Sequence, residues 1–93
     1  MAAFPVTFEF DPEKSAANKA KHGIDFAAAQ ALWGDPNGIA FPAKSVSEPR
    51  FGRLALLDGK LWMAYWTQRG EVVRLISVRR ARPSERTFYE SQD

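Results

Sequence analysis

Residues 50–79 read RFGRLALLDGKLWMAYWTQRGEVVRLISVR. Three runs in this stretch have the composition of β-strands, and short turn-forming segments separate them. The runs are Arg50–Leu57, Lys60–Thr67 and Glu71–Arg79. The first two flank Asp58-Gly59, a dipeptide typical of two-residue type I′ hairpins, and Gln68-Arg69-Gly70 predicts a second turn. We therefore expect three long strands joined as an antiparallel meander.

The chain before this meander predicts a short strand and then a helix. Val6–Phe10 alternates apolar and polar residues, as a half-buried strand does. Asp11 and Pro12 are the residue types preferred at the N-cap and the first position of a helix. The helix should run to about His22 and end at Gly23, a left-handed C-cap.

A second helix is expected over Phe26–Trp33, with Asp25 as its N-cap and Gly34 at its end. Its alanines would allow it to pack closely against the first helix as a hairpin. After a turn region at residues 35–38, Ile39–Phe41 predicts another short strand, and Pro42–Pro49 predicts a loop.

A last helix is expected to begin at Pro83 and to continue over Ser84–Ser91. The element order β-α-α-β-β-β-β-α indicates an α+β fold. We expect a single domain over residues 1–93, with an antiparallel sheet, a helical hairpin on one face and a C-terminal helix. The other face of the sheet would be partly open to a ligand.

The composition excludes several classes of protein. The 93 residues include no cysteine, so disulfides and thiolate metal sites are ruled out. Apolar runs are too short for a membrane helix of about 20 residues, and we expect a cytoplasmic protein without a membrane partner. The single histidine and the lack of the common catalytic motifs argue against a metal site or a cofactor.

Positive charge is concentrated near the C-terminus. Residues 72–88 contain five arginines and one acid, a net charge of +4, whereas the other residues carry eight basic and ten acidic side chains, or −2. The five are Arg74, Arg79, Arg80, Arg82 and Arg86. A guanidinium binds phosphate through two parallel hydrogen bonds. This arginine cluster is therefore the leading candidate for the working surface.

Strand alternation divides this cluster. In a regular strand Arg74 and Arg80 point to one face and Arg79 points to the other, so a single site would require a bulge or a reoriented strand end. The alternative reading is a solvated strand end, in which these arginines pair with acids. Those acids would be Glu71, Glu85 and Glu90.

Three further kinds of side chain allow two readings each. His22 could transfer a proton or simply lie in the last turn of its helix. Tyr89 could bring a hydroxyl to the arginine cluster or anchor the last helix on the sheet. Trp62, Tyr65 and Trp66 are more typical of a core strand than of a surface that stacks on nucleic-acid bases.

Two segments resemble the BrnT toxins. Phe8–Ala29, FEFDPEKSAANKAKHGIDFAAA, is similar to the N-terminal signature of that family, in which a helix closes with Lys-His-Gly. The segment RLISVRRA at Arg74–Ala81, followed by Glu85-Arg86 and Tyr89-Glu90, is similar to its C-terminal signature.

The resemblance implies a RelE-like fold and a toxin of a type II toxin–antitoxin pair that cleaves RNA to arrest translation. It also implies a BrnA-like antitoxin with a ribbon-helix-helix part, and an operator DNA that the complex represses. By position, Arg74 and Arg79 are the leading catalytic candidates, followed by Arg80 and Tyr89. Arg82 and Arg86 would contact the RNA backbone. Either Tyr89 or His22 could assist proton transfer, and the sequence does not choose between them.

The expected reaction is metal-independent transesterification, in which the RNA 2′-OH attacks the adjacent phosphate and arginines stabilise the developing charge. Two alternatives remain open. The same fold could serve as a non-catalytic module that binds the antitoxin, or the chain could be a small RNA-binding protein unrelated to toxins.

Overall fold

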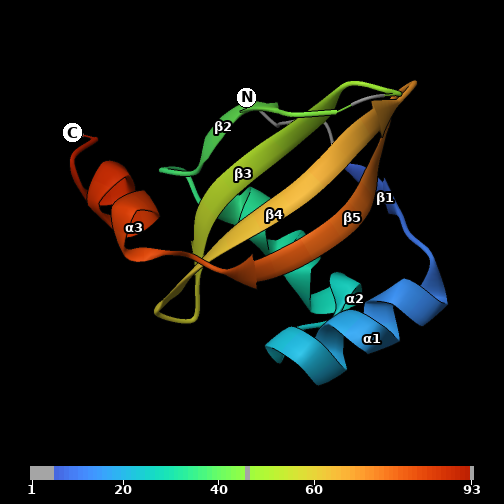
Figure 1. Cartoon of the computed structure of the whole chain (residues 1–93), viewed down its shortest axis with the longest axis horizontal. Helices are drawn as coiled ribbons and strands as arrows, with labels where there is room; N and C mark the ends of the chain where they lie inside the picture. The colour runs from blue at the N-terminus through green and yellow to red at the C-terminus, as the bar shows by residue number, and fades with distance from the viewer. Residues whose placement is uncertain (1–5, 46, 93) are drawn as a thin grey trace.

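The computed structural model describes residues 6–45 and 47–92, so Val46 of the predicted loop lies outside it, as do residues 1–5 and 93 of the predicted domain. It has an α+β architecture (Figure 1). In chain order the elements are β1 (Thr7–Glu9), α1 (Pro12–His22), α2 (Phe26–Ala29), the 3-10 helix η1 (Gln30–Gly34), β2 (Ile39–Ala43), β3 (Arg50–Leu57), β4 (Lys60–Arg69), β5 (Val72–Arg80) and α3 (Pro83–Glu90).

The predicted meander is confirmed. β3, β4 and β5 are consecutive antiparallel neighbours in a five-stranded sheet of order β1-β5-β4-β3-β2. Asp58 and Gly59 have φ angles of 52° and 78°, which are the positive values that a type I′ turn needs at both central residues. Gly70, with φ 61°, turns the chain from β4 into β5. Local turn chemistry thus fixes the central part of the sheet.

The two outer strands differ from the prediction. β1 pairs with β5 in parallel, so the expected fully antiparallel sheet is wrong at this edge. No local turn joins these two strands, and their relative direction therefore has no local sequence signal. β2 continues to Ala43, past the expected end at Phe41, because Pro42 lies on an edge strand where a missing N–H is tolerated.

The helix α1 has the predicted ends. The Asp11 carboxylate accepts a hydrogen bond from the Glu13 N–H at 2.8 Å, and Gly23 has φ 84° and donates to the Lys19 carbonyl. The predicted second helix is only partly correct, since the chain tightens after Ala29 into η1. The Leu32 carbonyl in this tight turn accepts a hydrogen bond from Arg53 Nε at 3.1 Å.

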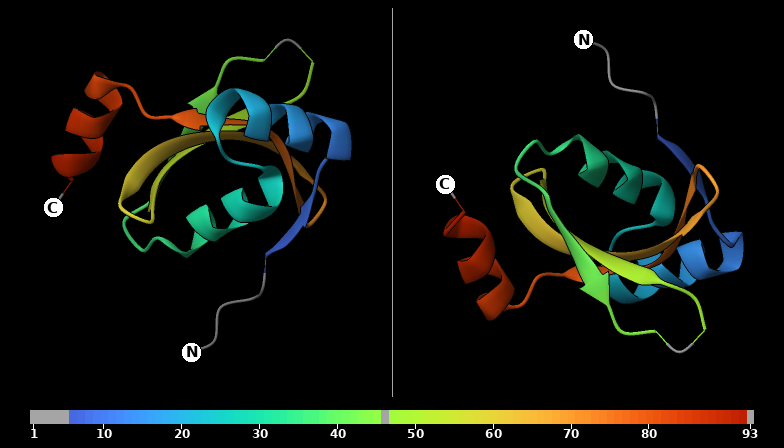
Figure 2. Two further views of the ribbon diagram at one scale, coloured as in Figure 1. Left: turned by 90° about the horizontal axis from the view of Figure 1, so that it is seen from below. Right: turned by 90° about the horizontal axis from the view of Figure 1, so that it is seen from above.

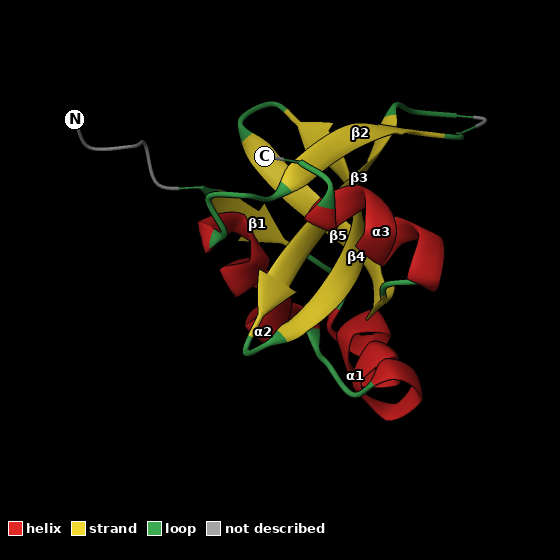
Figure 3. Ribbon diagram, turned by 90° about the vertical axis from the view of Figure 1, so that its left-hand side faces the viewer, coloured by secondary structure: helices red, strands yellow, loops and turns green. Residues whose placement is uncertain are grey.

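Two hydrophobic clusters lie on opposite sides of the sheet. The sheet curves around α2 and η1 (Figure 2), and this side holds the larger core. Its buried residues are Ile24, Phe26, Ala29, Leu32, Ala55, Trp62, Ala64, Val73, Leu75 and Val78. The other side holds the smaller cluster of Leu54, Leu61 and Met63, to which α3 contributes Tyr89. Figure 3 views the molecule from the side of α3, which lies in front of the strands in this view, with α1 and α2 below it.

The predicted helical hairpin on one face is wrong for α1. This helix lies alongside β5 (Figure 1), and its buried residues, Ser15 and Asn18, are polar. The Asn18 side chain accepts from the Val78 N–H at 3.1 Å and donates to the Val78 carbonyl at 2.9 Å. Asn18 therefore provides hydrogen-bond partners for the backbone N–H and carbonyl of Val78. These groups lie on the edge of β5 beyond the short β1, where a neighbouring strand would otherwise be needed.

Candidate functional site

A β-bulge changes which arginines share a face. Tyr65 is paired with Ser77, but the next residue of β4, Trp66, is paired with Leu75, so Ile76 of β5 has no partner on β4. Such an extra residue reverses the side-chain alternation beyond it. The bulge thus changes the face on which Arg74 lies relative to Arg79 and Arg80, which is the kind of change that a single arginine site requires.

As a result, Arg74 and Arg79 lie on the same face of β5, and Arg80 lies on the other. The expectation that Arg74 would share a face with Arg80 is wrong. Arg74 is opposite Thr67, Arg79 is opposite Met63, and Arg80 is opposite Trp62. The shared face is turned away from α2 and η1, and no helix crosses in front of β3, β4 and β5 in Figure 1.

Arg79 is held by an extended network on this face. Its Nη1 and Nη2 donate to the two carboxylate oxygens of Glu85 at 2.9 and 2.8 Å. Nη2 also donates to the Tyr65 hydroxyl at 2.9 Å, and the guanidinium lies 5.6 Å from the Tyr65 ring centroid. The hydrogen bonds to Glu85 are the main reason that the pKa of Arg79 is raised.

Glu85 also organises the start of α3. It accepts a hydrogen bond from the Arg82 N–H at 2.7 Å, which makes it part of the helix cap. Its pKa is lowered, chiefly by the hydrogen bonds from Arg79. The side chains of Arg79 and Glu85 are 17% and 20% exposed, so this ion pair is shielded from water far more than a surface pair.

Arg74 is more accessible. Its Nη1 contacts the Glu9 carboxylate at 3.0 Å, and the two side chains are 31% and 41% exposed. Arg74 thus makes one hydrogen bond to its acid, whereas Arg79 makes two to Glu85. An incoming anion could therefore displace Glu9 at a lower cost than it could displace Glu85 from Arg79.

The other three arginines occupy different places. Arg80 is exposed, and its guanidinium lies 5.4 Å from the Trp62 ring centroid. Arg82 is the exposed N-cap of α3, and Arg86 pairs with Glu90 at 3.6 Å along the same helix. The structure brings Arg74 and Arg79 onto one face but does not gather all five arginines.

Tyr89 contacts an acid rather than the arginine cluster. Its hydroxyl donates to the Asp35 carboxylate at 2.6 Å, which raises the pKa of Tyr89 to about 12. The same carboxylate oxygen accepts from the Leu56 N–H at 2.8 Å. Tyr89 therefore ties α3 to the end of η1 and the edge of β3, as the anchoring interpretation predicts.

His22 ends α1 beside Gly23. Within residues 6–45 and 47–92, no hydrogen bond or ion pair joins it to the arginines. Tyr65 is the site residue that sequence reasoning missed. Its position beside Arg79 depends on the pairing of β4 with β5, for which strand composition carries no signal.

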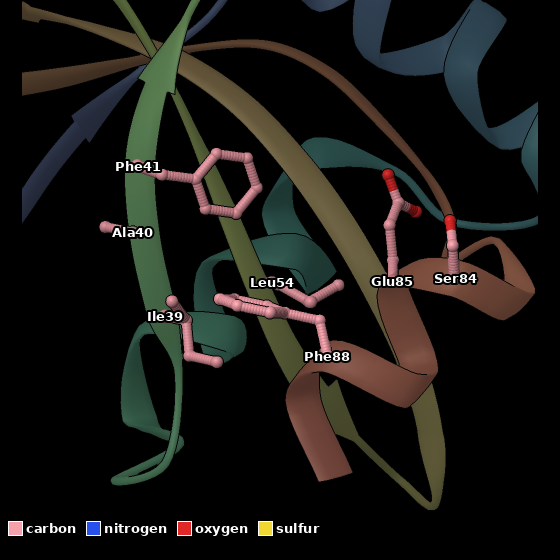
Figure 4. Close-up of a pocket in the computed structure, with 7 residues that line it drawn as sticks. All are labelled: Ile39, Ala40, Phe41, Leu54, Ser84, Glu85 and Phe88. Atoms are coloured by element: carbon pink, nitrogen blue, oxygen red, sulfur yellow. The ribbon is translucent and has the colours of Figure 1, made fainter. Parts of the chain in front are cut away.

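An apolar hollow of about 410 Å³ is lined by residues of β2, β3 and α3 (Figure 4). Strands β2 and β3 contribute Ile39, Phe41 and Leu54, and α3 contributes Phe88, which is 48% exposed. Glu85 lies at the rim of this hollow.

The described part of the chain has no cluster of three or more histidine, cysteine or acidic side chains placed to hold a metal ion. None of its helices is long and apolar enough to cross a membrane.

The fold and the site together define a class: a small α+β protein with two arginine side chains on the sheet face that is turned away from α2 and η1. Within that class, the chain belongs to the BrnT family. The family model described as the ribonuclease toxin BrnT of type II toxin–antitoxin systems matches residues 10–85. Membership implies an antitoxin partner. No curated protein matches the chain.

Proposed function

We propose that this toxin is an endoribonuclease that cleaves RNA by metal-independent transesterification on the open face of the sheet. The observation that carries the proposal is the bulge at Ile76, which puts Arg74 and Arg79 on one face next to Tyr65. The family provides the reaction class, and the more accessible guanidinium of Arg74, which makes one contact with Glu9, suits the phosphate of an RNA strand.

In this reaction the ribose O2′ forms a bond to phosphorus and the P–O5′ bond breaks. The products are a 2′,3′-cyclic phosphate and a 5′-OH, and the proton lost from the 2′-OH is balanced by one gained at O5′. Arg74 exchanges its single contact with Glu9 for the phosphate. A well-placed donor to the developing charge is worth about 3–4 kcal/mol.

Arg82 and Arg86 extend the positive surface onto α3, where both could contact phosphates further along the strand. We further propose a RelE-like fold, a cytoplasmic location and a BrnA-like ribbon-helix-helix antitoxin that represses its operon together with the toxin. These finer proposals rest on family membership.

The test is cleavage of a defined RNA by the purified toxin in EDTA and in Mg²⁺. We expect equal rates in both, and Arg74→Ala should slow cleavage about 100-fold. Lys21→Ala is the charge-matched control and should stay within about twofold, because this exposed lysine lies in the last turn of α1 rather than on the sheet. Cleavage only in Mg²⁺ would refute the mechanism.

A wild-type toxin that binds its antitoxin but leaves both RNA and cell growth unaffected would instead support the non-catalytic module. Growth arrest that is lost in Arg74→Ala while antitoxin binding is retained would support the enzyme.

A further inference from the structure

The two Nη groups of Arg79 are already committed within the protein. Nη1 donates to Glu85 and to the Arg80 carbonyl, at 2.9 and 3.1 Å, and Nη2 donates to Glu85 and to Tyr65. Binding a phosphate through the same fork would require Arg79 to leave a largely shielded carboxylate that also caps α3. Arg79 is therefore badly placed to hold RNA directly.

Tyr65 has a hydrogen-bonding capacity that Arg79 lacks. A phenol has one donor and can also accept, and the Tyr65 oxygen accepts from Arg79. Among the described residues, no acceptor receives the Tyr65 proton. The hydroxyl can therefore donate to a ligand on the open face.

The neighbours of Tyr65 favour such a ligand. Its direct partner on β5 is Ser77, a small side chain, and Arg74 is the partner of Thr67, two residues further along β4. Diagonal neighbours on one face of a sheet lie about 7–8 Å apart, within reach of a long side chain. An anion held by Arg74 can thus also contact the Tyr65 hydroxyl.

We propose that Tyr65 is a catalytic residue that donates a hydrogen bond to a non-bridging oxygen of the scissile phosphate, and that Arg79 is its positioning residue. This inference rests on the proposed ribonuclease function. The oxygen gains negative charge as the O2′–P bond forms and the P–O5′ bond breaks. Tyr65 keeps its proton throughout, and the hydrogen bond from Arg79 strengthens it as a donor.

The decisive experiment compares two Tyr→Phe variants in steady-state cleavage of one RNA. Tyr65→Phe should lower kcat about 100-fold with KM within about threefold, because the lost hydrogen bond acts in the transition state. Tyr89→Phe removes a hydroxyl that is bonded to Asp35, and its kcat should stay within about twofold. Thermal melts of both variants verify folding.

Two further substitutions, one of them also combined with Tyr65→Phe, test the role of Arg79. Arg79→Ala should lower kcat, and adding it to Tyr65→Phe should cause little further loss, since both remove the same interaction. Glu85→Gln weakens the hold on Arg79 and should lower kcat several-fold with KM little changed. This variant also tests the inference if Tyr65→Phe does not fold.

Three results would overturn the inference while leaving the ribonuclease intact. They are an unchanged kcat in Tyr65→Phe, additive losses in the double variant, and a higher kcat/KM in Glu85→Gln. The last would mean that freeing Arg79 lets it bind the phosphate itself. If the wild-type toxin does not cleave RNA, the proposed function fails, and this inference fails with it.

Discussion

Replacing Asn18 with alanine should destabilise the domain more than the same change at either of the other buried polar residues, Ser15 and Thr67. The Asn18 amide is 7% exposed and makes three hydrogen bonds: to the Ile24 carbonyl at 2.8 Å, to the Val78 carbonyl at 2.9 Å and from the Val78 N–H at 3.1 Å. Alanine would remove the partners of three backbone groups: the N–H and carbonyl of Val78 on the edge of β5, and the carbonyl of Ile24 between α1 and α2.

At about 1 kcal/mol for each group, the low end for buried polar groups, the free energy of unfolding should fall by about 3 kcal/mol. For a domain of this size each kcal/mol lowers Tm by about 4–8 °C, so we expect a loss of roughly 12–24 °C. Circular dichroism melts measure it. Hydrogen exchange should show that the Val78 amide loses its protection.

Ser15→Ala is the matched control on the same helix. It removes one hydrogen bond, from the Phe26 N–H at 2.9 Å, and should cost about 1 kcal/mol, or roughly 4–8 °C. If Asn18→Ala melts no lower than Ser15→Ala, the amide does not clamp the edge of β5, and the reasoning is wrong.

Three other variants have distinct signatures in denaturant titrations. Tyr89→Phe should lose about 1–2 kcal/mol. The pKa of Tyr89 in the folded protein is raised from 10.0 to about 12. The difference in the free energy of unfolding between the wild type and this variant should therefore be complete below pH 10 and should disappear as the pH rises through 12. Glu85→Gln should cost about 2 kcal/mol at pH 7. The lowered pKa of Glu85 means that this difference is present above pH 4.5 and shrinks in stronger acid. Arg86→Ala should change stability by less than about 0.5 kcal/mol, since its partner Glu90 is exposed. A pH-independent difference for Tyr89→Phe or Glu85→Gln would contradict the assigned ion and hydrogen-bond partners.

The sequence predicts those parts of the fold that local chemistry determines. Asp58-Gly59 makes its turn because both residues adopt positive φ, and Asp11 and Gly23 delimit α1 through bonds to residues within one turn. The direction of β1 depends instead on a partner strand far along the chain. The polar contacts of α1 with β5 likewise involve residues 60 positions apart.

For the candidate site, the position of the arginine-rich segment in the chain could be read from the sequence, but the arrangement of its side chains could not. Charge distribution alone identifies the arginine-rich segment. The solvated-end interpretation is correct only in part: Glu85 and Glu90 are among the paired acids, but the Arg79–Glu85 pair is shielded from water and Arg74 pairs with Glu9. The bulge at Ile76 decides which arginines share a face. It arises from the pairing of β4 with β5, and no residue type in β5 signals it. The position of Tyr65 beside Arg79 depends on the same strand pairing. In the sequence alone, Tyr65 therefore has the pattern of an ordinary core residue.

The most direct test of the central claim is an NMR titration of the toxin with an oligonucleotide whose 2′-deoxy sugar at the scissile position prevents cleavage. We expect the largest chemical-shift changes on the open face, at the amides of Arg74 and Ser77 and at the Tyr65 ring. Residues of the opposite core, such as Ala29 and Leu32, should change little. Shifts that centre on α2 and η1, with the open face unaffected, would contradict the account.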